Sequence, residues 1–238
     1  MARLVQALRR SIGRTLLLHF NRHQLSRQPE RLIPSFLAQS WTHSSADALY
    51  KSPFESNVLR ILRNEILYQS EYAPSHQPPA EFNSFSVEDR PGEQWMTLRG
   101  KFGENETIKI EATMFDGSVV VPKSGDDSDA EEMCLHISVL VDISKGKECD
   151  LEFVCSAWRD HMEIQKVYIF RRDKTLPPPY MGPNFRDLNH KLQNALLEFL
   201  KARGVDDNLS AFLHEFMMNK DRIELLGWLT KVKSFVEK

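Results

Sequence analysis

The chain has 238 residues, of which 41% are hydrophobic, and this length and apolar content suit one domain with a full hydrophobic core. No stretch is long and apolar enough to cross a bilayer as a helix. The formal net charge of −2 is unevenly distributed: residues 1–46 hold seven arginines and one acid, which leaves 24 basic and 32 acidic residues, a net charge of −8, in the remainder. An acidic body argues against binding through a nucleic-acid backbone, because such binding depends on Lys and Arg.

The first 46 residues have the composition of a cleaved organelle-targeting segment. On a helical wheel, Arg3, Arg10 and Arg14 fall within about 40° of one another, and apolar side chains occupy the facing side. A basic amphipathic helix without acids is typical of mitochondrial presequences, and a chloroplast transit peptide is the second choice. The alternatives are a helix on an anionic membrane and a disordered basic tail. We expect a presequence over 1–46 and a single domain over 47–238.

A helix is predicted to begin at Pro53. Ser52-Pro53-Phe54-Glu55 is a capping box with proline at the first helical position. The helix carries a wide apolar stripe, which needs more than one neighbour to cover it. The stripe consists of Phe54, Val58, Leu59, Ile61, Leu62, Ile66 and Leu67. Pro74, Pro78 and Pro79 end the helix and form a stiff linker.

Stretches of alternating apolar and polar residues follow, and they predict β-strands. These stretches are Met96–Phe102, Thr107–Phe115, Leu135–Ile143, Leu151–Ala157 and 162–170. Turn signals such as Asp116-Gly117 and Lys145-Gly146-Lys147 separate them, so an antiparallel meander with one buried face is expected. Gly125–Glu132 is expected to be a solvated acidic loop between two strands.

Two helices are predicted after Pro177–Pro179. Asn184 and Asp187 are the candidate caps of the first helix, which should stop at Arg203-Gly204. Asp207 is the candidate cap of the second, where apolar spacing continues to Val236. The order of helix, antiparallel sheet and two helices predicts the α+β class.

The sequence contains no convincing catalytic constellation. It has no GxSxG elbow, Walker A loop, GxGxxG or HExxH motif. Asp160-His161 could be half of an acid–base pair, but a solvated turn explains it better. His136 falls on the more polar face of its strand and is interpreted as an ordinary surface histidine. We therefore expect no enzyme activity, no cofactor and no metal site.

The remaining motifs also have simple structural explanations. The cysteines, Cys134, Cys149 and Cys155, are odd in number and lack CxxC spacing, which favours buried inert thiols in a reducing compartment. Pro177–Tyr180 matches a WW-domain ligand, but a rigid linker explains it equally well. The basic patch Arg171–Lys174 fits a solvated strand end better than an RNA contact, since no aromatic platform accompanies it.

Several stretches, in their order along residues 50–238, resemble the mitochondrial glycoprotein family, and the wording is closest to its plant members. They are Leu59–Ile66, Phe82–Trp95, Ile108–Gly117, Leu151–Trp158, Tyr180–Pro183 and Trp228–Val236. The family comprises acidic mitochondrial matrix proteins and includes the animal complement 1Q subcomponent-binding protein. The resemblance implies a twisted antiparallel β-sheet flanked by one N-terminal and two C-terminal α-helices, with three subunits in a ring-shaped homotrimer.

The resemblance also implies a function. Family members are binding proteins with chaperone-like behaviour and without an established active site, tied to mitochondrial translation, ribosome assembly and respiratory-complex maintenance. The leading hypothesis is a non-enzymatic matrix protein that binds basic proteins, possible ribosome components among them, through acidic patches. The alternative is an RNA-binding module associated with the mitochondrial ribosome, and an enzyme is a third hypothesis.

Two sets of residues are expected to carry this function. The candidate partner-binding residues are the consecutive acids of the loop, Asp126, Asp127, Asp129, Glu131 and Glu132, although the loop might serve solubility alone. The candidate oligomer contacts are apolar positions of the terminal helices, Phe54, Val58, Leu62, Leu225, Trp228, Leu229, Val232 and Phe235.

Overall fold

The computed structural model describes residues 52–72, 76–122, 131–146, 148–171 and 180–238. The chain divides into two compact units, Met1–Ile61 and Leu62–Lys238. In the first unit the described residues form the opening turns of helix α2 (Pro53–Tyr72). The second unit holds the rest of α2, the sheet and the C-terminal helices. The expected presequence, 1–46, lies outside the described residues.

Helix α2 begins at the predicted capping box. The backbone N–H of Ser52 donates to Oε2 of Glu55 at 2.7 Å, and the backbone N–H of Glu55 donates to Oγ of Ser52 at 3.2 Å. Two N–H groups that the helix cannot satisfy are thereby paired reciprocally. Pro53 occupies the first helical position, where its missing N–H costs nothing. The prediction of this helix start is confirmed.

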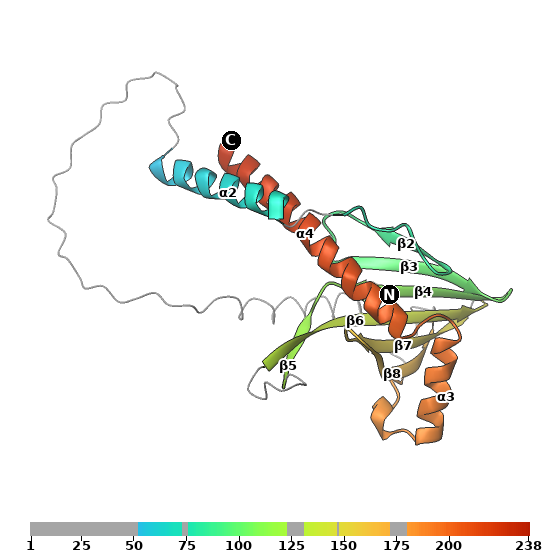
Figure 1. Cartoon of the computed structure of the whole chain (residues 1–238). Helices are drawn as coiled ribbons and strands as arrows, with labels where there is room; N and C mark the ends of the chain where they lie inside the picture. The colour runs from blue at the N-terminus through green and yellow to red at the C-terminus, as the bar shows by residue number, and fades with distance from the viewer. Residues whose placement is uncertain (1–51, 73–75, 123–130, 147, 172–179) are drawn as a thin grey trace. The chain divides into compact units, whose positions relative to one another are not determined.

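The centre of the second unit is an antiparallel sheet (Figure 1). Its strands are β1 (Glu81–Phe82), β2 (Phe85–Asp89), β3 (Trp95–Phe102), β4 (Glu106–Thr113), β5 (Gly117–Pro122), β6 (Glu131–Lys145), β7 (Cys149–Ala157) and β8 (Met162–Arg171). The order across the sheet is β1-β2-β3-β4-β6-β7-β8, and β5 pairs with the first half of β6. The α+β class and the antiparallel meander are confirmed.

Three of these strands were not expected from the sequence. β1 and β2 are short and are joined by a tight turn in which Asn83 has a φ of 49°. β5 contains three consecutive valines, so it lacks the alternation that marks a half-buried strand. β6 begins at Glu131, so Glu131 and Glu132 belong to a strand, which corrects the predicted end of the acidic loop.

Two helices follow the sheet, as predicted, but their caps differ from the prediction. A short 3₁₀ turn (Phe185–Asp187) precedes α3 (His190–Lys201), and the side chain of Asn189 caps α3 by accepting from the N–H of Lys191. Asn184 makes no side-chain cap. Asp206 caps α4 (Asp207–Glu237) by accepting from the N–H of Leu209.

The end of α3 agrees with the prediction. Gly204 has a φ of 77°, in the left-handed region that glycine adopts most easily. The N–H of Val205 then donates to the carbonyl of Leu200 at 3.1 Å. This geometry closes the helix and turns the chain toward α4.

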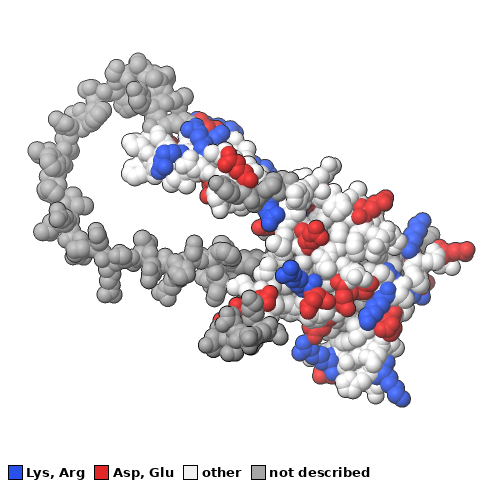
Figure 2. Space-filling model, in the orientation of Figure 1, with Lys and Arg blue, Asp and Glu red and all other residues white. Residues whose placement is uncertain are grey.

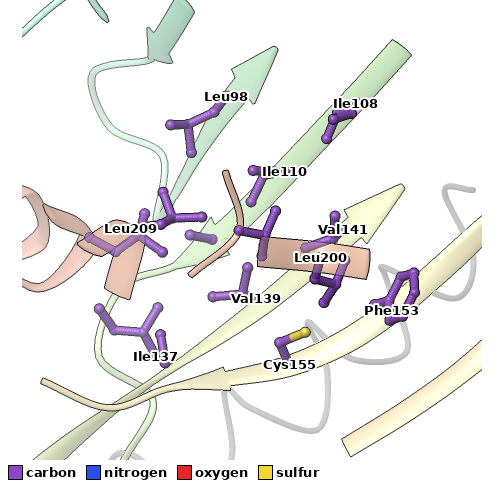
Figure 3. Packing of buried hydrophobic residues seen from close by; sticks show 14 of the residues in the cluster. Leu98, Ile108, Ile110, Ile137, Val139, Val141, Phe153, Cys155, Leu200 and Leu209 are labelled. Atoms are coloured by element: carbon purple, nitrogen blue, oxygen red, sulfur yellow. The ribbon is translucent and has the colours of Figure 1, made fainter. Parts of the chain in front are cut away.

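The core lies between one face of the sheet and the helices α3 and α4 (Figure 3). Leu98, Ile110, Ile137 and Val141 come from four neighbouring strands, and Leu200 and Leu209 come from the helices. Gly100 lets Phe85 lie close to the sheet, because a Cβ there would sit 2.6 Å from the Phe85 ring. The alternation that buries these residues turns their neighbours to the opposite face of the sheet.

Candidate binding surface

The sheet face opposite the core carries a row of polar side chains across four adjacent strands. In the strand register, Lys109 of β4 lies opposite Asp142 of β6, Asp142 opposite Glu152 of β7, and Glu152 opposite Tyr168 of β8. We call these four residues the carboxylate row. Residues that face one another in neighbouring strands have Cβ atoms about 5 Å apart, so their charges interact directly. Register therefore brings together groups that lie far apart in sequence.

The carboxylate row contains more negative than positive charge. Nζ of Lys109 lies 2.8 Å from Oε2 of Glu111 but 3.7 Å from Oδ2 of Asp142. The hydroxyl of Tyr168 donates a hydrogen bond to Oε1 of Glu152. Asp142 and Glu152 are 4% and 3% exposed, so water cannot screen them well. One ammonium group thus serves several carboxyl groups.

Asp142 has an unsatisfied atom. Within the described part of the chain, its Oδ1 is the one buried side-chain nitrogen or oxygen atom that has no hydrogen-bond partner. A buried carboxylate oxygen without a donor costs free energy, because it loses its water without replacement. The arrangement suits a carboxylate that accepts a bond from a group outside the described residues.

The pKa values of the row reflect this shortage of positive charge. Burial, and then the nearby charge of Asp142, raise the pKa of Glu152 to about 8. Burial also raises the pKa of Asp142, although the charge of Lys109 opposes the shift. Carboxyl groups with enough cationic partners show the opposite direction.

Glu106 shows that opposite direction at the end of the same sheet. Its carboxylate accepts from Nε and from the second terminal nitrogen of Arg203, at 2.8 and 3.0 Å, and Nζ of Lys145 lies 2.6 Å away. The hydrogen bond from Arg203 is the largest contribution to a pKa of about 2. The contrast with Glu152 separates a structural ion pair from an undercompensated one.

The predicted partner-binding acids lie elsewhere. Asp126, Asp127 and Asp129 lie outside the described residues. Glu131 and Glu132 are exposed at the start of β6. The structure thus brings none of the five into the carboxylate row.

The predicted oligomer residues differ in exposure. Phe54 is 84% exposed, Trp228 is 58% exposed and Phe235 is 78% exposed. Val58 is also exposed, Leu62, Leu225 and Val232 are half-buried, and Leu229 is buried. Three large apolar side chains on helical segments therefore face solvent in a single chain.

The two sequence-selected histidines lie near Trp158. His136 is not an ordinary surface residue, because its Nδ1 lies 2.7 Å from Oδ1 of the buried Asp116 and its ring packs against Trp158. Burial opposes ionisation of Asp116, but hydrogen bonds from His136 and Ser138 prevail and lower its pKa. The predicted turn at Asp160-His161 is confirmed, with both residues exposed.

The cysteines follow the prediction in part. Cys155 is buried, and burial raises its pKa to about 12, so its thiol is unreactive. Cys134 and Cys149 are half-buried. Across the described ranges, no group of three or more His, Cys, Asp or Glu side chains is placed to hold a metal ion. None of the described helices is long and apolar enough to cross a membrane.

Sequence reasoning missed the carboxylate row, although a signal was present. Asp142 and Glu152 appeared as ordinary polar positions of two alternating strands. The turn at Lys145–Lys147 joins these strands, and counting outward from it pairs Asp142 with Glu152. Acidic residues at paired positions of a hairpin are a recognisable sign of a strained electrostatic site.

These features define an α+β domain with one helix-covered sheet face and one carboxylate-bearing sheet face. Two solved structures share this fold. The Trypanosoma brucei p22 protein matches with a TM-score of 0.60 and 23% identity, over 77% of this chain and 98% of that one. A Leishmania major protein, described as a sequence homologue of human p32, matches with a TM-score of 0.60 and 16% identity, over 77% and 99%.

Sequence comparison places the chain more narrowly. The model of the mitochondrial glycoprotein family matches residues 62–236, and the chain belongs to this family. An uncharacterized mitochondrial protein of Arabidopsis thaliana is 32% identical over 91% of this chain and 88% of its own length. The mitochondrial acidic protein mam33 of Schizosaccharomyces pombe is 24% identical over 76% of this chain and 78% of its own length.

Proposed function

We propose that the chain is a mitochondrial matrix protein that binds basic protein partners and thereby supports mitochondrial translation, ribosome assembly or oxidative phosphorylation. The observation that carries this proposal is the carboxylate row, in which Asp142 and Glu152 share the single nearby ammonium group of Lys109. Family membership and the mitochondrial names of the relatives support the compartment. The Arg-rich composition of residues 1–46 supports import.

Charge supports this mode of binding over backbone binding to nucleic acid. Residues 47–238 carry a net charge of −8, so they attract cationic partners over the Debye length of about 8–10 Å. Figure 2 shows acidic and basic side chains interspersed on the face it presents, without a continuous basic surface. Binding of this kind is fast and weakens as salt rises.

Exposed apolar side chains support a homo-oligomer. Within the second unit, Leu67 and Tyr68 of α2 and Trp228 and Phe235 of α4 are each more than half exposed. Large apolar groups at this exposure favour a protein contact over solvent. The homotrimeric ring of the family would cover them.

Affinity capture tests the partner class. The chain is used as bait in extracts of isolated mitochondria at increasing salt, with and without RNase. We expect basic proteins to be retained at low salt, released at high salt and unaffected by RNase. Loss of all partners after RNase treatment would instead favour the RNA-binding alternative.

A second variant tests the predicted acidic segment. Asp126, Asp127 and Asp129 are changed to Asn, and Glu131 and Glu132 to Gln. If this segment steers partners, association slows at low salt while the thermal melt is unchanged. Equal association rates would assign docking to another surface.

Import is tested with residues 1–46 fused to a reporter. The reporter should reach mitochondria, and Arg3→Glu, Arg10→Glu and Arg14→Glu together should prevent it. Normal import of the triple variant would contradict the presequence assignment.

A further inference from the structure

The carboxylate row has the geometry of a seat for one additional cation. Asp142 and Glu152 face each other across β6 and β7. The nearest cation of the described residues, Nζ of Lys109, is 3.7 Å from Asp142 Oδ2 and closer to Glu111. Oδ1 of Asp142 is buried and has no donor. A donor carrying positive charge would satisfy this oxygen and relieve the repulsion between the two carboxyl groups at once.

Lys109 is poorly held and can leave. Its side chain is 23% exposed, as is that of Glu111, so the row is open to solvent at β4. A lysine side chain has a flexible four-carbon stem and a compact charge, so it can swing into solvent with little strain. The other end of the row is closed by Tyr168, whose hydroxyl donates to Glu152. A partner group therefore enters on the Lys109 side.

We infer that an arginine side chain of a basic protein partner binds the carboxylate row, and that it displaces the ammonium group of Lys109 from Asp142. This inference rests on the proposed function and gives its binding site. A guanidinium group suits the row better than an ammonium group, because its planar fork can donate to two carboxyl groups together. Lys109 acts as an internal competitor that keeps the seat occupied until a partner arrives.

Peptide binding to the full chain tests the inference. A fluorescent hexa-arginine peptide is titrated at low salt against the wild type and against Lys109→Gln. Removal of the competitor should tighten binding by roughly fivefold. Lys101→Gln is the matched control, because Lys101 lies exposed on the same sheet face and its removal changes the net charge equally. The control should change the affinity by less than about twofold.

Asp142→Asn tests the seat itself. It keeps the shape of the side chain and removes its charge, so hexa-arginine should bind at least about fivefold more weakly. A hexa-lysine peptide provides the comparison of cations and should respond less to both changes, since it cannot form the forked contact. If Lys109→Gln melts at a clearly lower temperature, Lys109→Met, which keeps the apolar stem, takes its place.

The outcomes separate this inference from the proposed function. If hexa-arginine does not bind the wild type at low salt, the proposed function itself fails. If it binds, but Lys109→Gln equals Lys101→Gln and Asp142→Asn keeps its affinity, the inference alone is overturned. Equal responses of the two peptides to Asp142→Asn would overturn the preference for arginine.

Discussion

The ammonium group of Lys220 is buried between α4 and the turn after β2, where its Nζ lies 2.6 Å from Oδ1 of Asp89. The same nitrogen lies 3.2 Å from the carbonyl oxygen of Arg90 and 3.2 Å from Oε1 of Glu224. Lys220 is 1% exposed, so its three N–H groups are satisfied by three protein acceptors. The contact ties the middle of α4 to the edge of the sheet.

The buried position of Lys220 predicts an asymmetric response to mutation. Asp89→Asn leaves the buried ammonium group without its strongest partner and should cost about 2–3 kcal/mol. Lys220→Met removes the buried charge and leaves carboxylates that are 22% and 24% exposed, which water can reach. It should cost only about 1 kcal/mol. Urea unfolding measures both changes.

The exposed pair Arg99–Glu88 provides the control. Its side chains are 49% and 41% exposed, so Glu88→Gln should change stability by less than about 0.5 kcal/mol. A larger loss for Lys220→Met than for Asp89→Asn would show that burial of the lysine does not govern this contact.

Arg203 joins the end of α3 to the sheet through several contacts at once. Besides its forked bond to Glu106, it donates to the carbonyl of Phe199 at 2.8 Å and lies 3.5 Å from the centre of the Phe199 ring. Arg203→Lys keeps the charge but loses the fork and the stacking, so it should cost about 1–3 kcal/mol. Lys145→Gln should cost less, because the Lys145 side chain is 62% exposed.

The effect of Arg203→Lys should depend on pH. The folded pKa of Glu106 is about 2, below its ordinary value of 4.5, so the stabilisation is present above pH 4.5 and is lost as the pH falls toward 2. The stability difference between wild type and variant should therefore shrink between pH 5 and pH 3 in urea unfolding. A difference that stays constant over this range would contradict the proposed role of the ionised Glu106.

Sequence reasoning succeeded where local chemistry decides the structure. The reciprocal cap of Ser52 and Glu55 and the left-handed stop at Gly204 depend on neighbours within a few residues. It failed where a distant contact decides. Asp207 resembles a helix cap, but its side chain accepts from the N–H of Met162 at 3.0 Å, and Asp206 takes the capping role.

The candidate site shows the same division. Alternation predicted that the positions of Asp142 and Glu152 face away from the core. It could not show that they are buried, since burial and the distance to Lys109 follow from strand register and from the packing of the whole sheet. Site residues of this kind become visible only when the strands are paired.

The exposed end of α4 predicts a change in assembly. Trp228→Gln together with Phe235→Gln removes two large apolar groups that are 58% and 78% exposed. If these groups lie in a contact between copies of the chain, the sedimentation coefficient should fall toward that of a monomer while the thermal melt of the sheet persists. Leu192→Gln on α3, also an exposed apolar position, should leave assembly unchanged. An unchanged sedimentation coefficient for the double variant would remove this end of α4 from the oligomer contact.

Glu152→Gln should stabilise the protein in a pH-dependent manner. The folded pKa of Glu152 is about 8 and its ordinary value is 4.5, so the folded state keeps a proton that the unfolded state has released. A carboxyl group with a raised pKa favours folding below pH 4.5, and stability falls as the pH rises from 4.5 to 8, after which the loss is complete. Glutamine keeps the acceptor for Tyr168 and cannot ionise, so the variant avoids this loss.

Thermal melts from pH 5 to pH 9 test this expectation. The gain in Tm from Glu152→Gln should be near zero at pH 5, grow through pH 8 and then level off, and each kcal/mol corresponds to about 2–4 °C in a domain of this size. Glu104→Gln, in the exposed turn between β3 and β4, should show no such trend. If the gain is already full at pH 5, lost repulsion of an ionised Glu152 cannot be its cause. The same variant should also weaken hexa-arginine binding, because stability and the cation seat make opposite demands on one carboxyl group.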